Sequence, residues 1–202
     1  MNYDMTREAP IHGSNPSHTV GFDPSHIALR DIRFGLDSVL YHGRSMRAVL
    51  RECSMNERSG LAITSLTGRL FADNTLIRIP ELRLLTPNSE ITLVGQTYWE
   101  LLKIPTTGRL GAQLTAIIGK QDVLLLAGSL PDTFKEAYPF RPLVIRAGTD
   151  GNLKQMQLSR FTADLPGAFT MTGAGELLNL TDSVHRSGKL DFNLKTMDLG
   201  FL

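Results

Sequence analysis

Residues Ile77–Gly95 read IRIPELRLLTPNSEITLVG, in which two alternating runs flank a TPNS turn at residues 86–89. Successive side chains of a strand point to opposite faces of a sheet, so this alternation predicts a β-hairpin with one apolar face. The apolar positions of the hairpin are Ile77, Ile79, Leu82, Leu84, Ile91 and Leu93. No catalytic motif lies within the stretch, which therefore points to architecture rather than to chemistry.

The same arrangement recurs at Ile27–Gly43 (IALRDIRFGLDSVLYHG) and at Met156–Gly173 (MQLSRFTADLPGAFTMTG). In each copy the first run contains one step of three residues, from 29 to 32, from 79 to 82 and from 158 to 161. Such a step moves the apolar side chains to the other face unless the strand bulges or bends there. Pro80 falls inside the step, at a position where proline is tolerated. The three segments therefore predict three bent hairpins of the same design.

The rest of the chain predicts a mainly β fold, an elongated and bent antiparallel sheet with hairpin repeats. Clean alternation runs through Leu110–Ile118, and the apolar residues at 99–104 are interpreted as a strand edge. One or two short helices are expected around residues 120–138, the only notable ones, with Asp122 at a candidate N-terminus. Short helices between sheet segments commonly plug an open end or cover an apolar face.

The domain organisation follows from the same pattern. Residues 1–26 are rich in Pro, Gly and Ser and predict an extended N-terminal arm. Residues 27–202 predict a single repeat-built β domain, with the proline-bounded segment 139–142 as the place for an internal boundary. The last alternating run, residues 189–202, would leave an unpaired edge that a further repeat could continue. We therefore expect the chain to be part of a longer protein.

The charge and composition argue against a nucleic-acid-binding protein. The formal net charge is +1, from 21 basic and 20 acidic residues, and aromatic residues make up only 7%. Electrostatic binding of nucleic acid uses a basic stripe, and base stacking uses aromatic side chains. We therefore expect no nucleic-acid partner.

The sequence contains no motif that carries catalysis or metal binding. The Gly-Lys pair at 119–120 lacks the Ser or Thr that follows it in a phosphate-binding loop. His12, His18 and His26 lie in the arm, without the further ligands and rigid frame that a metal site needs. Cys53 is the single cysteine and is interpreted as a small apolar residue of a strand. We expect no catalytic residue, no metal, no cofactor and no enzymatic activity.

No segment approaches the roughly 20 apolar residues of a membrane-spanning helix, because the longest apolar run is VLLLA at 123–127. The first residues, MNYDMTREAP, contain no apolar core of a signal peptide. Two interpretations remain open, a cytoplasmic protein or a soluble piece of a longer exported one. Repeats favour the second, because isolated repeats usually belong to longer arrays.

Several stretches resemble the TamB/AsmA-like family of Gram-negative envelope proteins, and in particular its Bacteroides-like members. The resemblance covers about residues 22–202, and no single motif in it is long. The resemblance consists of the order in which alternating apolar residues, glycines and prolines follow one another along the chain. The stretches that carry it are Phe22–Tyr41, Met55–Asp73, Leu82–Ser89, Gly151–Pro166 and Gly188–Phe192.

The resemblance implies a sheet folded into a groove-lined half-pipe, a β-taco, in the periplasm. It also implies a parent protein anchored to the inner membrane that functions in outer-membrane biogenesis and phospholipid transport. The expected partners are phospholipid or another lipid, neighbouring repeats of the parent chain and an outer-membrane assembly protein. The N-terminal membrane helix and C-terminal domain of full family members are not found in this sequence. Anchoring and docking are therefore not carried over to particular residues.

An apolar groove would hold acyl chains by burying CH₂ groups, at about 0.8 kcal/mol each. Phosphate headgroups are expected to stay in water, because the sequence shows no basic pocket. The alternative for the same residues is an ordinary closed core. The residues expected to face inward and line the groove are Ile77, Ile79, Leu82, Leu84, Ile91, Leu93, Leu110, Leu114 and Met171.

A second class of function is a carbohydrate- or protein-binding β-sandwich module. Its expected sign is a cluster of aromatic side chains on exposed loops. Trp99 is the only tryptophan and the four tyrosines are scattered, so Trp99 is interpreted as a residue that packs at a strand end.

Overall fold

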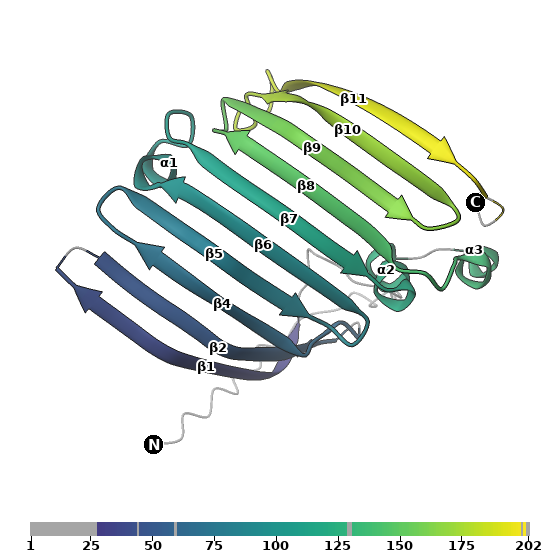
Figure 1. Ribbon diagram of the computed structural model, residues 1–202, viewed down its shortest axis with the longest axis horizontal. Helices are drawn as coiled ribbons and strands as arrows, with labels where there is room; N and C mark the ends of the chain where they lie inside the picture. The colour runs from purple at the N-terminus through teal and green to yellow at the C-terminus, as the bar shows by residue number, and fades with distance from the viewer. Residues whose placement is uncertain (1–27, 44, 59, 129–130, 199, 201–202) are drawn as a thin grey trace, which may run out of the picture.

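A computed structural model describes residues 28–43, 45–58, 60–128, 131–198 and 200. The predicted arm at 1–26, with its histidines, lies outside these residues. The described chain forms one 11-stranded antiparallel sheet in which, apart from the short β3, the strands follow one another in chain order, confirming the predicted mainly β fold (Figure 1). Its strands are β1 (Leu29–His42), β2 (Ser45–Glu57), β3 (Ala62–Ile63), β4 (Ser65–Ala72), β5 (Leu76–Leu85), β6 (Ser89–Tyr98), β7 (Leu110–Ile118), β8 (Leu143–Gly151), β9 (Gln155–Leu165), β10 (Phe169–Leu178) and β11 (Ser187–Thr196).

The sheet is bent, and the three-residue steps of the sequence are β-bulges. On β1 the step from Arg30 to Arg33 faces only two residues of β2. On β5 the step from Ile79 to Leu82, which contains Pro80, faces two residues of β6. On β9 the step from residue 158 to 161 faces two residues of β10. Each bulge takes up the extra residue of the step. The apolar side chains before and after it therefore point to the same face of the sheet, as the sequence predicts.

The hairpin predicted for the first copy is wrong, while those of the other two copies are present. Residues 29–42 form one continuous strand that pairs with β2 throughout, with register shifts near Gly35 and Leu36. The second copy turns at its TPNS segment, where the Thr86 hydroxyl accepts the backbone N–H of Ser89 at 2.8 Å. The third turns at a Pro-Gly pair, where Gly167 has a φ of 85°. The first copy contains Gly35, Asp37 and Ser38 at the corresponding place but no proline, and it stays extended.

The register keeps one face of the sheet apolar and the other polar. The residues aligned with Leu82 on successive strands are Leu93, Leu114, Ala147 and Phe161. The next row, on the opposite face, aligns Arg83, Thr92, Thr115, Arg146 and Thr162. The same alternation extends through β7 and β8. These two strands pair with each other although the segment 139–142, which the sequence suggests as an internal boundary, lies between them in the chain.

Two of the three helices cover one end of the apolar face. These are α2 (Lys120–Leu126) and α3 (Asp132–Ala137), at the right-hand end of Figure 1. Val123 of α2 and Phe134 of α3 pack against the only cluster of buried apolar residues among those described, Tyr138, Leu165 and Ala168. The predicted helices near 120–138 are therefore confirmed. They close an end of the sheet rather than forming a second layer over it.

The third helix, α1 (Trp99–Lys103), forms at the opposite end, where the sequence analysis interprets residues 99–104 as a strand edge. The segment WELLK instead forms one turn, with Glu100 in the first turn and Lys103 in the last. Leu101 is buried because the chain folds back so closely that a Cβ on Gly108 would lie 2.3 Å from the Leu101 nitrogen. Glu, Leu and Lys are good helix formers, and the close contact with Gly108 fixes the position of the helix.

The TPNS turn between β5 and β6 holds α2 in place. The Asp122 carboxylate, buried at the start of α2, accepts hydrogen bonds from the hydroxyls of Thr86 and Ser89. It also accepts one from the Asn88 side-chain amide at 3.3 Å. The Ser89 hydroxyl in turn accepts the backbone N–H of Gly119 at 3.1 Å. The turn therefore has a structural role, because its side chains donate the hydrogen bonds that the buried Asp122 carboxylate accepts.

Candidate functional site

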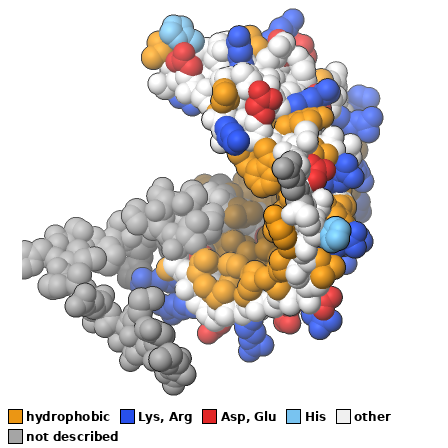
Figure 2. All heavy atoms as spheres, turned by 90° about the vertical axis from the view of Figure 1, so that its left-hand side faces the viewer, with side chains coloured by type: hydrophobic (Ala, Val, Ile, Leu, Met, Phe, Trp, Pro, Cys, Tyr) orange, Lys and Arg blue, Asp and Glu red, His pale blue; other side chains and the backbone are white. Residues whose placement is uncertain are grey.

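The concave face of the sheet is a hollow lined with hydrophobic side chains. Figure 2 looks along the long axis of Figure 1 and shows a C-shaped outline, with hydrophobic side chains inside and Lys and Arg side chains on the outer side. The strand register assigns this face to Met46, Ala48, Leu50, Leu66, Leu70, Ile77, Ile79, Leu82, Leu84, Ile91, Leu93, Leu110, Ala112, Leu114, Ala116, Ile145, Ala147, Met156, Leu158, Phe161, Ala163, Met171, Leu190, Phe192 and Leu194.

The structure brings all the residues predicted to line a groove onto this concave face. Within β5 and β6, Leu84 pairs with Ile91 and Leu82 with Leu93. The row that starts at Ile91 continues through Ala116, Ile145 and Ala163 to Met171 on β10. The other members join the same face, and they are Ile77, Ile79, Leu110 and Leu114.

These predicted residues are all half-buried, and none of them is sealed inside a core. Among the described residues, no second sheet or helical layer lies over the middle of the concave face. A sheet with one large apolar face normally covers that face with another layer or with a bound group. The concave face is therefore the part of the molecule best suited to take an apolar ligand.

Small residues widen the middle of the hollow, and the sequence analysis did not single them out. Gly95 pairs with Ala112, and Ala116 pairs with Ile91, so short side chains alternate with branched ones across β6 and β7. Ala147 and Ala163 continue this on β8 and β9. The pattern is visible only from the strand register, because it depends on which residue of the neighbouring strand lies beside each small residue.

The C-terminal end of the concave face is aromatic. Phe161 of β9 and Phe192 of β11 meet edge to face, with ring centroids 5.9 Å apart. Gly173 of β10 lies between them, and a Cβ there would be 2.3 Å from Phe192 Cδ1. Phe192 therefore folds over the strand where the glycine leaves room, and it remains 52% exposed.

The two outermost strands expose large apolar side chains on the same face. On β1, Leu36, Val39 and Tyr41 pair with concave-face residues of β2 and are 49–75% exposed. On β11, Leu190 and Leu194 are 40% and 57% exposed. Each of these strands has one described neighbour, so its outer backbone edge is available for pairing.

Two carboxylates of the described residues are held by hydrogen bonds from nearby residues in the sequence. The backbone N–H groups of Thr75 and Leu76 donate to Asp73, and these bonds lower the pKa of that carboxyl. The pKa of Asp182 is lowered mainly by a hydrogen bond from the His185 side chain. Backbone N–H groups that donate to the same carboxylate lower it further. The described residues contain no group of three or more His, Cys, Asp and Glu side chains that could hold a metal.

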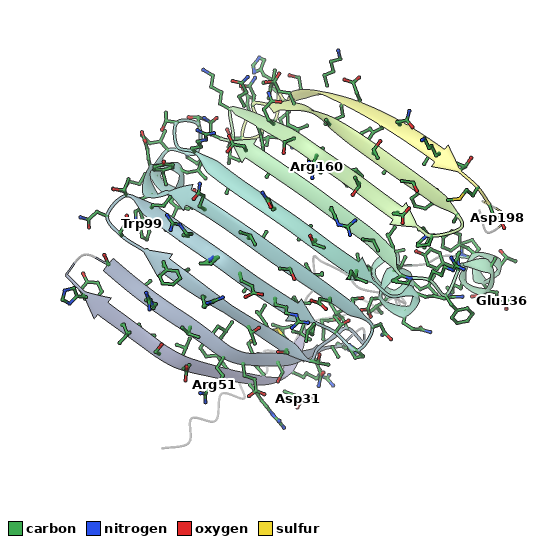
Figure 3. All side chains as sticks on the ribbon, in the orientation of Figure 1. Asp31, Arg51, Trp99, Glu136, Arg160 and Asp198 are labelled. Atoms are coloured by element: carbon green, nitrogen blue, oxygen red, sulfur yellow. The ribbon has the colours of Figure 1, made fainter. Side chains whose placement is uncertain are left out.

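Two single residues have the structural positions that the sequence suggests. Cys53 is buried on β2 at 5% exposure, paired with Phe34 of β1. Trp99 begins α1 at the strand end of β6, where its indole N–H donates to the Asp73 carbonyl oxygen (Figure 3). In the described part of the chain, none of the helices has the length and apolar character needed to cross a bilayer.

The chain matches no protein-family model, no curated protein and no solved structure.

Proposed function

We propose that this chain is a section of a periplasmic scaffold for envelope biogenesis, whose concave face shields phospholipid acyl chains between the inner and outer membranes. The observation that carries the proposal is the continuous, half-buried apolar lining of an open hollow. The resemblance to the TamB/AsmA-like family supplies the envelope setting. The protein binds lipid and catalyses no reaction.

The chemistry of the lining suits acyl chains. A hydrocarbon tail gains about 0.8 kcal/mol for each buried CH₂ group and needs no hydrogen-bonding partner. The lining residues are mostly aliphatic, with Phe161 and Phe192 at one end and with alanines and glycines that leave room, so they offer dispersion contacts along the hollow. A polar ligand such as a sugar would leave its hydroxyls without partners on this face.

The outer strands suit a scaffold built from further repeats of a parent chain anchored to the inner membrane. β1 and β11 each carry the same apolar alternation as the inner strands and have an available backbone edge. Neighbouring repeats would pair with these edges and lengthen the hollow. An outer-membrane assembly protein would receive the far end of the array.

The β-sandwich alternative finds less support in this geometry. A sandwich needs two sheets that face each other, whereas the described residues form a single sheet. Binding of a carbohydrate or a protein by exposed loops stays a prediction, to be tested by a glycan array with Trp99→Ala as the comparison.

The proposal is tested by extracting the purified native chain with organic solvent and identifying lipids by mass spectrometry. Phospholipid is expected with the unchanged chain and in much smaller amount with Leu93→Gln. The matched control is Val94→Gln, the next residue of β6, which points to the outer face and is 42% exposed. Circular dichroism checks that both variants fold. A folded chain that carries no lipid and takes up no added phospholipid would overturn the proposal.

A further inference from the structure

A cavity of about 390 Å³ lies where β1, β2, β4 and β5 end, outside the concave lining. Arg47 and Arg78 form its cationic side, and Phe71, Leu40 and Leu76 are among its apolar walls. Met46, at the margin of the concave lining, also borders the cavity. Its volume lies in the range of about 300–1,000 Å³ that is typical of small-molecule pockets. The cavity therefore combines positive charge with apolar surface.

The strand register places the two arginines on one face with the aromatic ring between them. Arg47 of β2 pairs with Phe71 of β4, which pairs with Arg78 of β5. The Arg47 guanidinium lies 4.6 Å from the centroid of the Phe71 ring, a cation–π contact that orients it. The two arginines are far apart in the sequence, which explains why no basic pocket was expected.

Neither guanidinium forms a salt bridge with a carboxylate of the described residues, although the charge of Arg78 acts on the nearby Asp73 carboxylate. Other arginines of the sheet form such a bridge, as in Arg83 with Glu90 and Arg109 with Asp150, each at 2.8 Å. Arg47 and Arg78 form no ion pair of this kind, and both are exposed.

One acidic residue also lines the cavity. Asp73 is committed to the turn that follows β4, since its Oδ1 accepts the backbone N–H groups of Thr75 and Leu76 at 2.8 and 2.9 Å. Two guanidiniums therefore face one carboxylate that is already hydrogen-bonded. The cavity keeps a surplus of positive charge and of unused N–H donors.

We propose that this cavity binds a phosphate group, with Arg47 and Arg78 as its ligands and Phe71, Leu40 and Leu76 against the organic part of the molecule. Guanidinium groups bind phosphate oxygens through paired N–H donors and stay charged at every physiological pH. The phosphate can belong to a phospholipid headgroup or to a free phosphate ester. The phospholipid source rests on the proposed function, whereas the phosphate site itself does not.

Isothermal titration calorimetry of the full chain tests the site with three probes: inorganic phosphate, dihexanoyl phosphatidic acid below its micelle concentration, and dihexanoylglycerol, which has no phosphate. Phosphatidic acid is expected to bind, and Arg47→Gln and Arg78→Gln are each expected to weaken it by about tenfold. The matched control is Arg160→Gln. Arg160 is an exposed arginine in the middle of β9, away from the cavity, and forms no ion pair with the described residues (Figure 3). Its replacement is expected to leave the affinity unchanged.

The three probes separate the sources. If phosphatidic acid binds and inorganic phosphate competes with it, the natural ligand is a lipid headgroup. If inorganic phosphate binds and phosphatidic acid does not, the natural ligand is a free phosphate compound. The inference is overturned if neither phosphate probe binds, or if Arg160→Gln weakens binding as much as Arg47→Gln. Leu93→Gln is expected to leave phosphate binding intact, so an empty phosphate site and an empty concave face are distinguishable results.

Discussion

Asp122 is buried at the start of α2, and its carboxylate accepts hydrogen bonds from the side chains of Thr86, Asn88 and Ser89. A buried carboxylate of this kind is tolerable only because its oxygens are hydrogen-bonded. The same bonds join a turn of the sheet to the helix that closes one end of the hollow. One residue therefore couples the local geometry of a hairpin to the position of α2.

Replacing Asp122 with Ala is expected to lower the free energy of unfolding by about 3 kcal/mol. The change removes the acceptor of three side-chain hydrogen bonds and leaves the buried Ser89 hydroxyl and the half-buried Thr86 hydroxyl without it. Urea denaturation followed by circular dichroism measures the effect. The control is Asp132→Ala, an exposed residue whose carboxylate pairs only with Lys135 at 2.9 Å, and it is expected to leave the stability nearly unchanged. Equal losses in the two variants would contradict the role given to Asp122.

At the scale of elements, β-bulges and turn residues decide how each strand runs. The step from Ile79 to Leu82 was visible in the sequence as a break in the period of two, and it is a bulge. Turn chemistry was equally visible in the TPNS segment and around Gly167. At β1 the residues Gly35, Asp37 and Ser38 lie at register shifts of a continuous strand, so turn-type residues without a proline do not make a hairpin there. The sequence therefore predicts a hairpin well where the break in alternation is accompanied by turn residues that include a proline.

Gly108→Ala is expected to destabilise the protein by about 1–3 kcal/mol, because its Cβ would lie 2.3 Å from backbone nitrogen and 2.5 Å from backbone Cα of Leu101. That backbone belongs to α1 and cannot move aside as a flexible side chain can. Thermal unfolding measures the difference. Gly111→Ala is the control, since its Cβ would meet only the Asp150 carboxylate at 3.4 Å. A stable Gly108→Ala variant would show that α1 packs less closely than described.

At the scale of the whole molecule, the open concave face is expected to bind neutral apolar dyes while the protein is native. Nile red fluorescence should rise and shift to shorter wavelength on binding, and palmitate should displace the dye. Leu114→Gln is expected to weaken the signal, whereas Ile117→Gln, on the outer face of β7 and 41% exposed, is expected to leave it unchanged. Enhancement that appears only in denaturant would contradict an open native face.

The sequence was sufficient to place the predicted lining residues on one face but not to show how that face curves. Alternation assigned Leu82 and Leu93 to the same side, since period and register follow from local pattern. The curvature, the packing of α2 and α3 over Leu165, and the meeting of Arg47 with Arg78 depend on contacts between distant segments. These features required the strand order and the coordinates.

Every strand of the sheet pairs with a strand next to it in the chain or separated from it only by the two-residue β3. Because loop-closure entropy is small for such neighbours, each hairpin can close without waiting for a distant partner. A chain of this design can fold progressively, from whichever end is available first. A protein delivered as an extended thread through a membrane pore could therefore build its sheet one strand at a time as it emerges.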